Sequence, residues 1–323
     1  MGSDSHYQIP AIDFSINSTE LDRGTDKWYN LCKRVREACE NYGCFEIVYD
    51  KIPLQLKADT FSMIRQLFNL PVETKEKNVN PKPFHGYYGQ YPTTPFYESF
   101  GIEDSSNYES FKSFTELMWP DGHEQFCNTV VTMVKKMDEL KEMIEMMILD
   151  SYGLGEKLNS IIACNKTLLR VMKYDAPPSG QYANGHYGLT PHTDKLVSTI
   201  LCDDQVSGLE FETKDGQWVK LSLSPTSYLF IVGDPLMAWS NGRMHRLKHR
   251  VMISGGKERY SLGAFGSPLE GTIIKAAKEL VDDEHPRILK DFDYKDFSKF
   301  TFTQEGSAID SEMQVFAFAG IST

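Results

Sequence analysis

The sequence predicts a mainly β fold in which a helical first half precedes a strand-rich second half. Apolar residues recur at helical spacing in three segments before residue 151. From residue 167 onward the chain breaks into short runs rich in β-branched and aromatic residues. These runs recur about every ten residues between Gly, Pro and Asp turns, which favours a sandwich or barrel over alternating strand–helix units.

Three segments of the first half are predicted to be helices: 26–41, 53–69 and 122–150. In the first helix Leu31 and Val35 share one face, and Gly43 follows as a residue suited to a left-handed cap. A short buried strand, 44–48, comes next. The third helix gives the strongest signal, because apolar residues recur at helical spacing over 126–148 while charged residues fill the other face.

Seven runs of the second half are predicted to be strands: 167–175, 196–204, 208–213, 217–222, 227–235, 247–253 and 258–265. Residues 269–291 are predicted to be helical again. Residues 79–118 are aromatic, contain several Gly and Pro, and lack periodicity. A segment of this kind is expected to be either an active-site wall or an ordered wrapping loop.

Composition limits the kinds of partner. The 323 residues carry a net charge of −11, which argues against a nucleic-acid or anionic-membrane surface because such surfaces need clustered cations. The six cysteines include no CxxC pair, so we interpret them as reduced thiols. We see neither a signal-peptide pattern nor an apolar run long enough to cross a bilayer, and we expect a cytoplasmic, monomeric protein.

Two histidines and a carboxylate suggest a metal site. His192 and Asp194 are two residues apart, so on an extended strand both side chains would point to the same side. A second imidazole could come from His245 or His249, and spacing alone leaves that choice open. Two His and one carboxylate on one face of an octahedron suit a non-haem Fe(II) centre with open positions. An isolated His-x-Asp pair is more often a surface pair or a core histidine.

A candidate anion clamp follows the second histidine. Arg259 lies ten residues after His249, and Ser261 would share its strand face. A guanidinium beside a hydroxyl suits one end of a dicarboxylate. Without the metal motif, the same residues would be interpreted as a solvated edge-strand arginine and its neighbour.

Taken together, HTD, the distal histidine and RYS resemble the iron triad and the RxS motif of the plant 2-oxoglutarate-dependent dioxygenases. IPAIDF, ACENYGCFEIV, SNGRMHRLKHRV and MKYD also match segments of that family in order. The resemblance implies a double-stranded β-helix (jelly roll) core with supporting helices and an N-terminal extension. It implies Fe(II), 2-oxoglutarate and O2 as reactants, with ascorbate as a supporting reductant.

The resemblance also implies roles for single residues. His192, Asp194 and His249 would hold iron, because the family places its ligand in His-Arg-Val. Arg259, Ser261 and Tyr174 would bind 2-oxoglutarate, although Met172 replaces the family's usual Asn. Halogenating relatives replace the carboxylate by a small residue, so Asp194 favours hydroxylation, desaturation, demethylation or oxidative cyclisation.

FHGYYG, YESFGIED and SGLEFETKDGQW are most similar to the alkenyl- and hydroxyalkyl-producing branch of the family. We expect a small specialised metabolite as substrate and hydroxylation as the reaction. The candidate substrate-pocket residues are all aromatic: Phe84, Tyr88, Tyr91, Phe100, Phe265, Phe316 and Phe318. A non-catalytic metal-binding jelly roll and a zinc hydrolase remain as alternatives.

The expected organisation is one compact unit with two regions. Residues 1–120 would form the N-terminal region with the aromatic substrate-proximal loop. Residues 121–323 would hold a helix, the catalytic core at 166–268 and a C-terminal segment.

Overall fold

A computed structural model provides the fold of the chain. The structure describes residues 8–15, 21–89, 91, 94–156, 165–177, 186–253 and 256–321. The first seven residues and Cys164, one of the six cysteines, lie outside these ranges.

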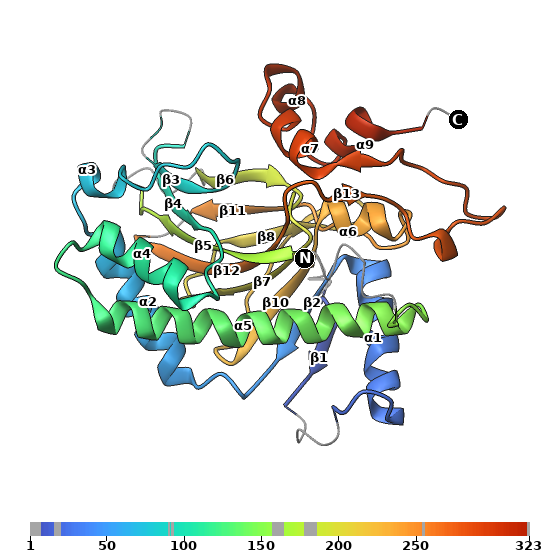
Figure 1. The fold of residues 1–323 in the computed structure, drawn as a ribbon, viewed down its shortest axis with the longest axis horizontal. Helices are drawn as coiled ribbons and strands as arrows, with labels where there is room; N and C mark the ends of the chain where they lie inside the picture. The colour runs from blue at the N-terminus through green and yellow to red at the C-terminus, as the bar shows by residue number, and fades with distance from the viewer. Residues whose placement is uncertain are drawn as a thin grey trace, which may run out of the picture.

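Two stacked β-sheets form the jelly roll (Figure 1). One sheet has eight strands in the order β1-β2-β10-β7-β12-β5-β4-β3, and the other has four in the order β6-β11-β8-β9. The larger sheet comprises β1 (Ala11–Asp13), β2 (Cys44–Val48), β3 (Gly86–Gly89), β4 (Tyr97–Ile102), β5 (Asn165–Tyr174), β7 (Ser198–Asp203), β10 (Ser227–Val232) and β12 (Arg259–Pro268). The smaller sheet comprises β6 (His186–His192), β8 (Leu209–Glu212), β9 (Trp218–Lys220) and β11 (His249–Ile253).

Helices cover the outer face of the larger sheet, and the long helix α5 runs beneath its strands in Figure 1. They are α1 (Asp26–Tyr42), α2 (Leu54–Phe68), α3 (Val72–Lys75), α4 (Tyr108–Met118) and α5 (Glu124–Ser151). The three predicted helices are confirmed as α1, α2 and α5. One apolar cluster fills the space between these helices and the sheet, and a second fills the space between the two sheets.

Local sequence explains where α1 begins and ends. The Thr25 side chain accepts a hydrogen bond from the Trp28 N–H at its start, and Gly43 ends it with φ of 70°. A Cβ at Gly43 would also lie 2.6 Å from the His245 carbonyl oxygen. Glycine therefore meets two needs here, a left-handed backbone and close approach to the chain before β11.

The aromatic segment 79–118 is more regular than the sequence suggests. It contains β3, β4 and α4, and β4 pairs along β5, so the N-terminal half extends the same sheet that carries the core strands. All six residues of β4 are buried. A strand covered on both faces shows no apolar–polar alternation, which explains why periodicity did not reveal it.

The helix predicted over 269–291 is wrong. This stretch contains β13 (Ile273–Ile274) and a 3-10 turn, η3 (Lys278–Leu280), separated by turns and bends. β13 pairs instead with β14 (Phe292–Asp293), and Gly271 adopts φ of 80°. The remaining short helices are α6 (Asp234–Trp239), α7 (Tyr294–Phe300), α8 (Gln304–Ala308) and α9 (Gln314–Ala319).

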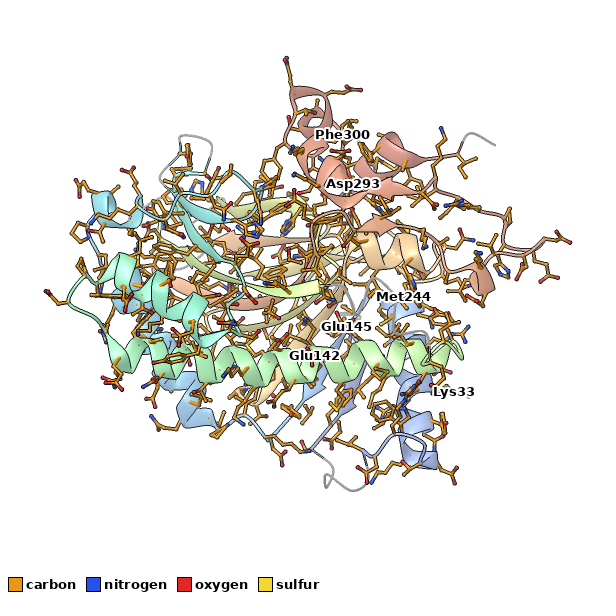
Figure 2. The ribbon with its side chains drawn as sticks, in the orientation of Figure 1. Lys33, Glu142, Glu145, Met244, Asp293 and Phe300 are labelled. Carbon is orange, nitrogen blue, oxygen red and sulfur yellow. The ribbon has the colours of Figure 1, made fainter. Side chains whose placement is uncertain are left out.

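A buried polar contact ties α5 to the sheet. Glu145, labelled in Figure 2, accepts a hydrogen bond from the Ser198 hydroxyl of β7 at 2.5 Å. Burial raises the pKa of the Glu145 carboxyl, although Lys141 one turn earlier opposes the shift. The long helix is therefore held to the core by a defined polar contact as well as by its apolar face.

Two broader expectations can be compared with the described residues. Cys32, Cys39, Cys44, Cys127 and Cys202 are free thiols within that part of the chain. None of the helices described there is long and apolar enough to cross a membrane.

Candidate metal and co-substrate site

The strand register places two histidines directly opposite each other. His192 ends β6 and His249 begins β11, and the two are paired across the smaller sheet. Their ring centroids lie 4.2 Å apart. Together with Asp194 they offer one ligand atom each within 4.8 Å of one another, a spacing suited to a metal ion.

Asp194 reaches this point from just beyond the end of β6, not from within an extended strand as expected. Its Oδ1 lies 3.9 Å from His192 Nε2 and 3.8 Å from His249 Nε2. Its Oδ2 accepts a 2.5 Å hydrogen bond from the Thr199 hydroxyl of β7. Its backbone carbonyl accepts the N–H of Asp234 at 2.8 Å. These contacts fix the carboxylate where strand geometry no longer does.

Both imidazoles are oriented by backbone carbonyls. The Nδ1 of His192 lies 2.8 Å from the Thr190 carbonyl oxygen, and that of His249 lies 3.0 Å from the Leu247 oxygen. A carbonyl oxygen can only accept, so each Nδ1 carries the proton and each Nε2 is left as a lone-pair donor. Burial and the neighbouring His249 ring lower the pKa of His192. Neutral imidazoles with aligned lone pairs are what a metal requires.

His245 is not part of this group. It precedes β11, and its backbone N–H donates to the Cys39 carbonyl at the end of α1. Burial and the nearby Lys214 and Arg246 lower its pKa to about 4.

A buried ionic cluster, which sequence reasoning missed, supports the loop after Asp194. Lys195 Nζ donates to Asp234 Oδ2 at 2.8 Å and to the Ser311 carbonyl at 2.6 Å. Arg246 Nη1 lies 3.4 Å from the other Asp234 oxygen and donates to the Glu312 carbonyl at 2.6 Å. The C-terminal segment is thereby joined to the residues that follow Asp194.

The second half of the site lies on β12 and its neighbours. Arg259 is 3% exposed, and its Nη2 donates to Asp203 Oδ2 at 3.0 Å while its Nε donates to the Val206 carbonyl at 3.0 Å. Its Nη1 is buried and has no hydrogen-bond partner among the described residues. A buried guanidinium nitrogen with unused donors fits an incoming oxyanion.

Ser261 and Tyr174 share the same inner face as Arg259. Tyr174 is paired with Arg259 across β5 and β12, and its ring centroid lies 5.3 Å from the guanidinium carbon. Burial raises the pKa of Tyr174, while a hydrogen bond with Ser261 opposes that rise. The phenol therefore stays neutral and keeps its proton for an acceptor. Asp203 lies on β7, directly opposite Ser261 of β12, and its carboxylate balances part of the Arg259 charge. The sequence alone did not reveal this role of Asp203.

Comparison with known proteins agrees with this site. Residues 162–268 match the 2OG-Fe(II) oxygenase superfamily, and residues 9–121 match the N-terminal region of the non-haem dioxygenases of morphine synthesis. The chain is 41% identical to the probable 2-oxoglutarate-dependent dioxygenase AOP1.2 of Arabidopsis thaliana, over 96% of each protein. The chain belongs to the plant 2-oxoglutarate-dependent dioxygenases. It falls in their AOP-like branch.

Solved structures support the same fold. The rice dioxygenase for auxin oxidation superposes with a TM-score of 0.80 at 29% identity, over 97% of this chain and 100% of that one. Its Arabidopsis thaliana counterpart, a binary complex with 2-oxoglutarate, gives a TM-score of 0.76 at 28% identity, over 87% and 100%. This dioxygenase therefore uses Fe(II) and 2-oxoglutarate and oxidises a small-molecule substrate.

The dioxygenase brings some of the predicted pocket aromatics to the inner face and not others. Phe265 lies on β12 two residues from Gly263, and a Cβ at Gly263 would meet the Phe265 ring at 2.4 Å. Phe84 packs against Phe302 with ring centroids 5.0 Å apart. Tyr88 and Tyr91 are partly exposed and pack against each other in a tilted arrangement, with ring centroids 4.5 Å apart.

Phe100 does not belong to the pocket. It alternates with Ser99 and Gly101 on β4, faces the helices and packs against Phe68 at 5.4 Å. Phe318 packs among the C-terminal aromatics, 5.3 Å from Phe300, and Phe316 lies 5.2 Å below the Arg246 guanidinium. Phe100 therefore serves packing on the helix side of the sheet, whereas Phe316 and Phe318 pack against residues of the C-terminal half.

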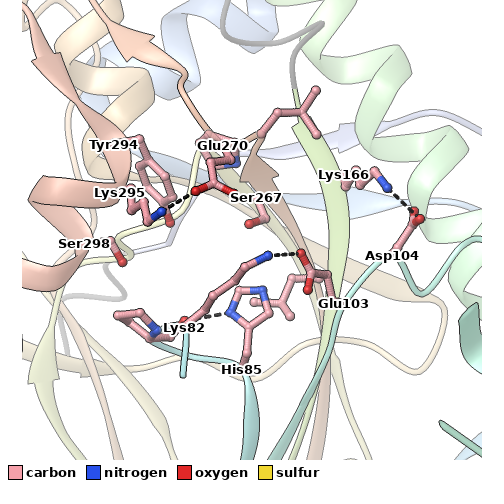
Figure 3. Close-up of a pocket in the computed structure, with 14 residues that line it drawn as sticks. Lys82, His85, Glu103, Asp104, Lys166, Ser267, Glu270, Tyr294, Lys295 and Ser298 are labelled. Atoms are coloured by element: carbon pink, nitrogen blue, oxygen red, sulfur yellow. Dashed lines mark hydrogen bonds and ion pairs between the residues drawn. The ribbon is translucent and has the colours of Figure 1, made fainter. Parts of the chain in front are cut away.

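A cavity of about 250 Å³ opens where β5 begins and β12 ends, against α7 (Figure 3). Lys82, Lys166 and Lys295 line it, and each pairs with an acidic side chain. His85 also lines it, and burial lowers the pKa of that imidazole. No residue of the triad lines this cavity. Its cations are already paired, so it offers no obvious anion site.

Proposed function

We propose that His192, Asp194 and His249 hold the Fe(II), and that Arg259, Ser261 and Tyr174 bind the distal carboxylate of 2-oxoglutarate. The reaction we propose is hydroxylation of a small apolar specialised metabolite. Bound Fe(II) and 2-oxoglutarate supply the oxidising power, by oxidative decarboxylation of 2-oxoglutarate to succinate with O2.

The observation that carries the proposal is the pairing of two complementary half-sites. The triad presents two imidazole nitrogens and a carboxylate oxygen. The clamp presents the buried Nη1 of Arg259, which has no hydrogen-bond partner in the described part of the chain. A structural-metal protein would need the first half-site but not the second. Leaving a buried guanidinium donor unsatisfied costs about 1–3 kcal/mol, which a bound carboxylate would recover.

The protein's own contribution is to position and to shield. Thr199 and the backbone of Asp234 hold Asp194, and the carbonyls of Thr190 and Leu247 hold the imidazoles. Asp203 holds Arg259 in place, so the fork is oriented before 2-oxoglutarate arrives. No side chain has to act as a general acid or base, since the metal and co-substrate carry the chemistry.

The proposal extends to where and how the enzyme works. A net charge of −11 and the five free cysteines of the described chain are consistent with a cytoplasmic enzyme in a reducing environment. We propose a monomer that binds neither nucleic acid nor membrane. We expect ascorbate to support turnover.

A metabolite screen scored by succinate tests this function. Purified enzyme with Fe(II), 2-oxoglutarate and O2 should release succinate faster when its substrate is present, and mass spectrometry should show a product that has gained one oxygen atom. Loss of two hydrogen atoms would indicate desaturation instead. Product formation without 2-oxoglutarate or O2, as a zinc hydrolase would give, contradicts the proposal.

A further inference from the structure

The inner face of β5 carries a second arginine that the co-substrate clamp does not use. Arg170 pairs with Gly263 of β12 on one side and with Gly101 of β4 on the other. Its Nη2 donates to the Tyr97 hydroxyl at 3.1 Å and to the Ser99 hydroxyl at 3.2 Å. Its Nε is buried and has no partner among the described residues.

The partners of Arg170 are neutral, in contrast to those of the neighbouring cations. Arg259 has Asp203, and Lys173, on the opposite face of β5, has Asp175 at 2.7 Å. No ion pair involving Arg170 occurs among the described residues. An unneutralised, partly desolvated guanidinium on an inner wall favours an anion brought by a ligand.

Glycines on the two strands beside Arg170 let Phe84 and Phe265 come close to it. A Cβ at Gly101 would lie 2.1 Å from the Phe84 carbonyl oxygen, so glycine lets this part of the chain cross β4. Phe84 itself takes φ of 68°, a costly left-handed conformation for a bulky residue. Its ring centroid lies 5.9 Å from the Arg170 guanidinium carbon. On the other side, Gly263 makes room for the Phe265 ring.

Arg170 and Phe265 are related to the metal triad through the strand register. Phe265 pairs with Thr199 on β7, and Thr199 donates to Asp194. Arg170 is two strands and two residues from Thr199, which corresponds to roughly 12 Å between their backbones. A small molecule anchored at Arg170 could therefore lie along Phe265 and present a carbon to the metal site.

We propose that the substrate is an apolar small molecule bearing a carboxylate, and that Arg170 binds this carboxylate between Phe84 and Phe265. This inference rests on the proposed function and names the substrate class of the same site. Arg170 is a substrate-binding residue here, distinct from Arg259, which takes the carboxylate of 2-oxoglutarate. Tyr97 and Ser99 orient its guanidinium and leave the remaining donors for the substrate.

Matched ligands provide the test. The ligands would carry a phenyl, an indolyl or an n-octyl group. Each of these groups would be tested with three different ends: an acetic acid, a primary acetamide and a methanesulfonate. Binding would be measured by calorimetry to the Fe(II)- and 2-oxoglutarate-loaded enzyme without oxygen. We expect at least one acid to bind about 10- to 100-fold more tightly than its amide, the range of a charge-assisted hydrogen bond. Tighter binding of the sulfonate than of the acid would indicate that the substrate carries a sulfonate and not a carboxylate, and would overturn the proposed substrate class. A panel in which no acid exceeds its amide, including one in which nothing binds, also overturns it.

Variants separate binding from folding and from co-substrate effects. Arg170→Gln should abolish the preference for the acid while 2-oxoglutarate affinity and melting temperature stay near wild type. Arg170→Lys should keep a weakened preference for the acid over the amide. It replaces Arg170→Gln as the test variant if the Gln variant folds poorly. Arg36→Gln is the matched control, because Arg36 also lies over an aromatic ring, that of Tyr152, but on α1. The inference is contradicted if Arg170→Gln still prefers the acid over the amide. It is also contradicted if this variant loses 2-oxoglutarate binding and not the preference for the acid. Failure of the wild type to bind 2-oxoglutarate would instead contradict the proposed function.

Discussion

The hydrogen bond from Thr199 to Asp194 offers a sharp perturbation of the metal site. Thr199→Val replaces the hydroxyl by a methyl group of similar size at a position that is 1% exposed. The 2.5 Å bond to Asp194 Oδ2 is lost, and Oδ1 is no longer fixed between the two imidazoles. Hydrogen bonds to charged groups contribute about 1.5–3 kcal/mol. Losses of metal affinity at such supporting positions are about 10- to 100-fold.

Anaerobic titration of metal-free enzyme with Fe(II) measures this effect. We expect the dissociation constant of Thr199→Val to rise by about 10- to 100-fold, and that of Thr199→Ser to stay near wild type because serine keeps the hydroxyl. Thr115→Val is the matched control, since Thr115 is also buried but donates to the Phe111 carbonyl within α4. Iron affinity within twofold of wild type in Thr199→Val would refute the reasoning that this bond orients the carboxylate.

Three further predictions follow from the same geometry. Arg259→Met should raise KM for 2-oxoglutarate by about 100-fold with little change in iron content. Asp203→Asn should raise KM less, because the guanidinium stays but is less firmly held. If Asp203 were the main determinant, steady-state kinetics would show the larger increase in KM for Asp203→Asn. Lys195→Met should lower the free energy of unfolding by about 3 kcal/mol, because it removes one of the two cations that pair with Asp234 in the described part of the chain. An unchanged denaturant midpoint would contradict this. Partial burial lowers the folded pKa of His245 to about 4, so the stabilising contribution of its neutral form is present above the unfolded pKa and is lost as pH falls from about 6.5 to 4. His245→Gln should therefore flatten the acid side of the stability profile, and a profile identical to wild type would exclude His245 as its cause.

Much of the fold could be predicted because its helices are amphipathic and its core strands are separated by clear turns. The parts that could not be predicted lack those signals. The strand β4 is buried on both faces, so its residues do not alternate, and Phe100 was therefore placed in the pocket when it faces the helices. The stretch 269–291 has helix-forming composition, but pairing of Ile273 and Ile274 with β14 overrides it.

The candidate site shows the same division between local and non-local information. The residues of the triad and the clamp could be named from sequence, since their types and spacing carry the chemistry. Their supports could not. Thr199, Asp203 and Asp234 reach the site through register and loop contacts between strands far apart in the chain. Arg170 also needed the structure, because only its position shows that none of the described residues gives it an acidic partner.

Iron analysis of single-residue variants tests the central claim most directly. Wild-type enzyme and His245→Ala, reconstituted anaerobically with Fe(II) and desalted, should each retain about one iron per chain, as expected for a single triad that excludes His245. His249→Ala and Asp194→Ala should retain almost none, and their melting temperatures and circular dichroism would show whether they are folded. Full iron retention in folded His249→Ala, together with loss in folded His245→Ala, would contradict the assignment of the metal site.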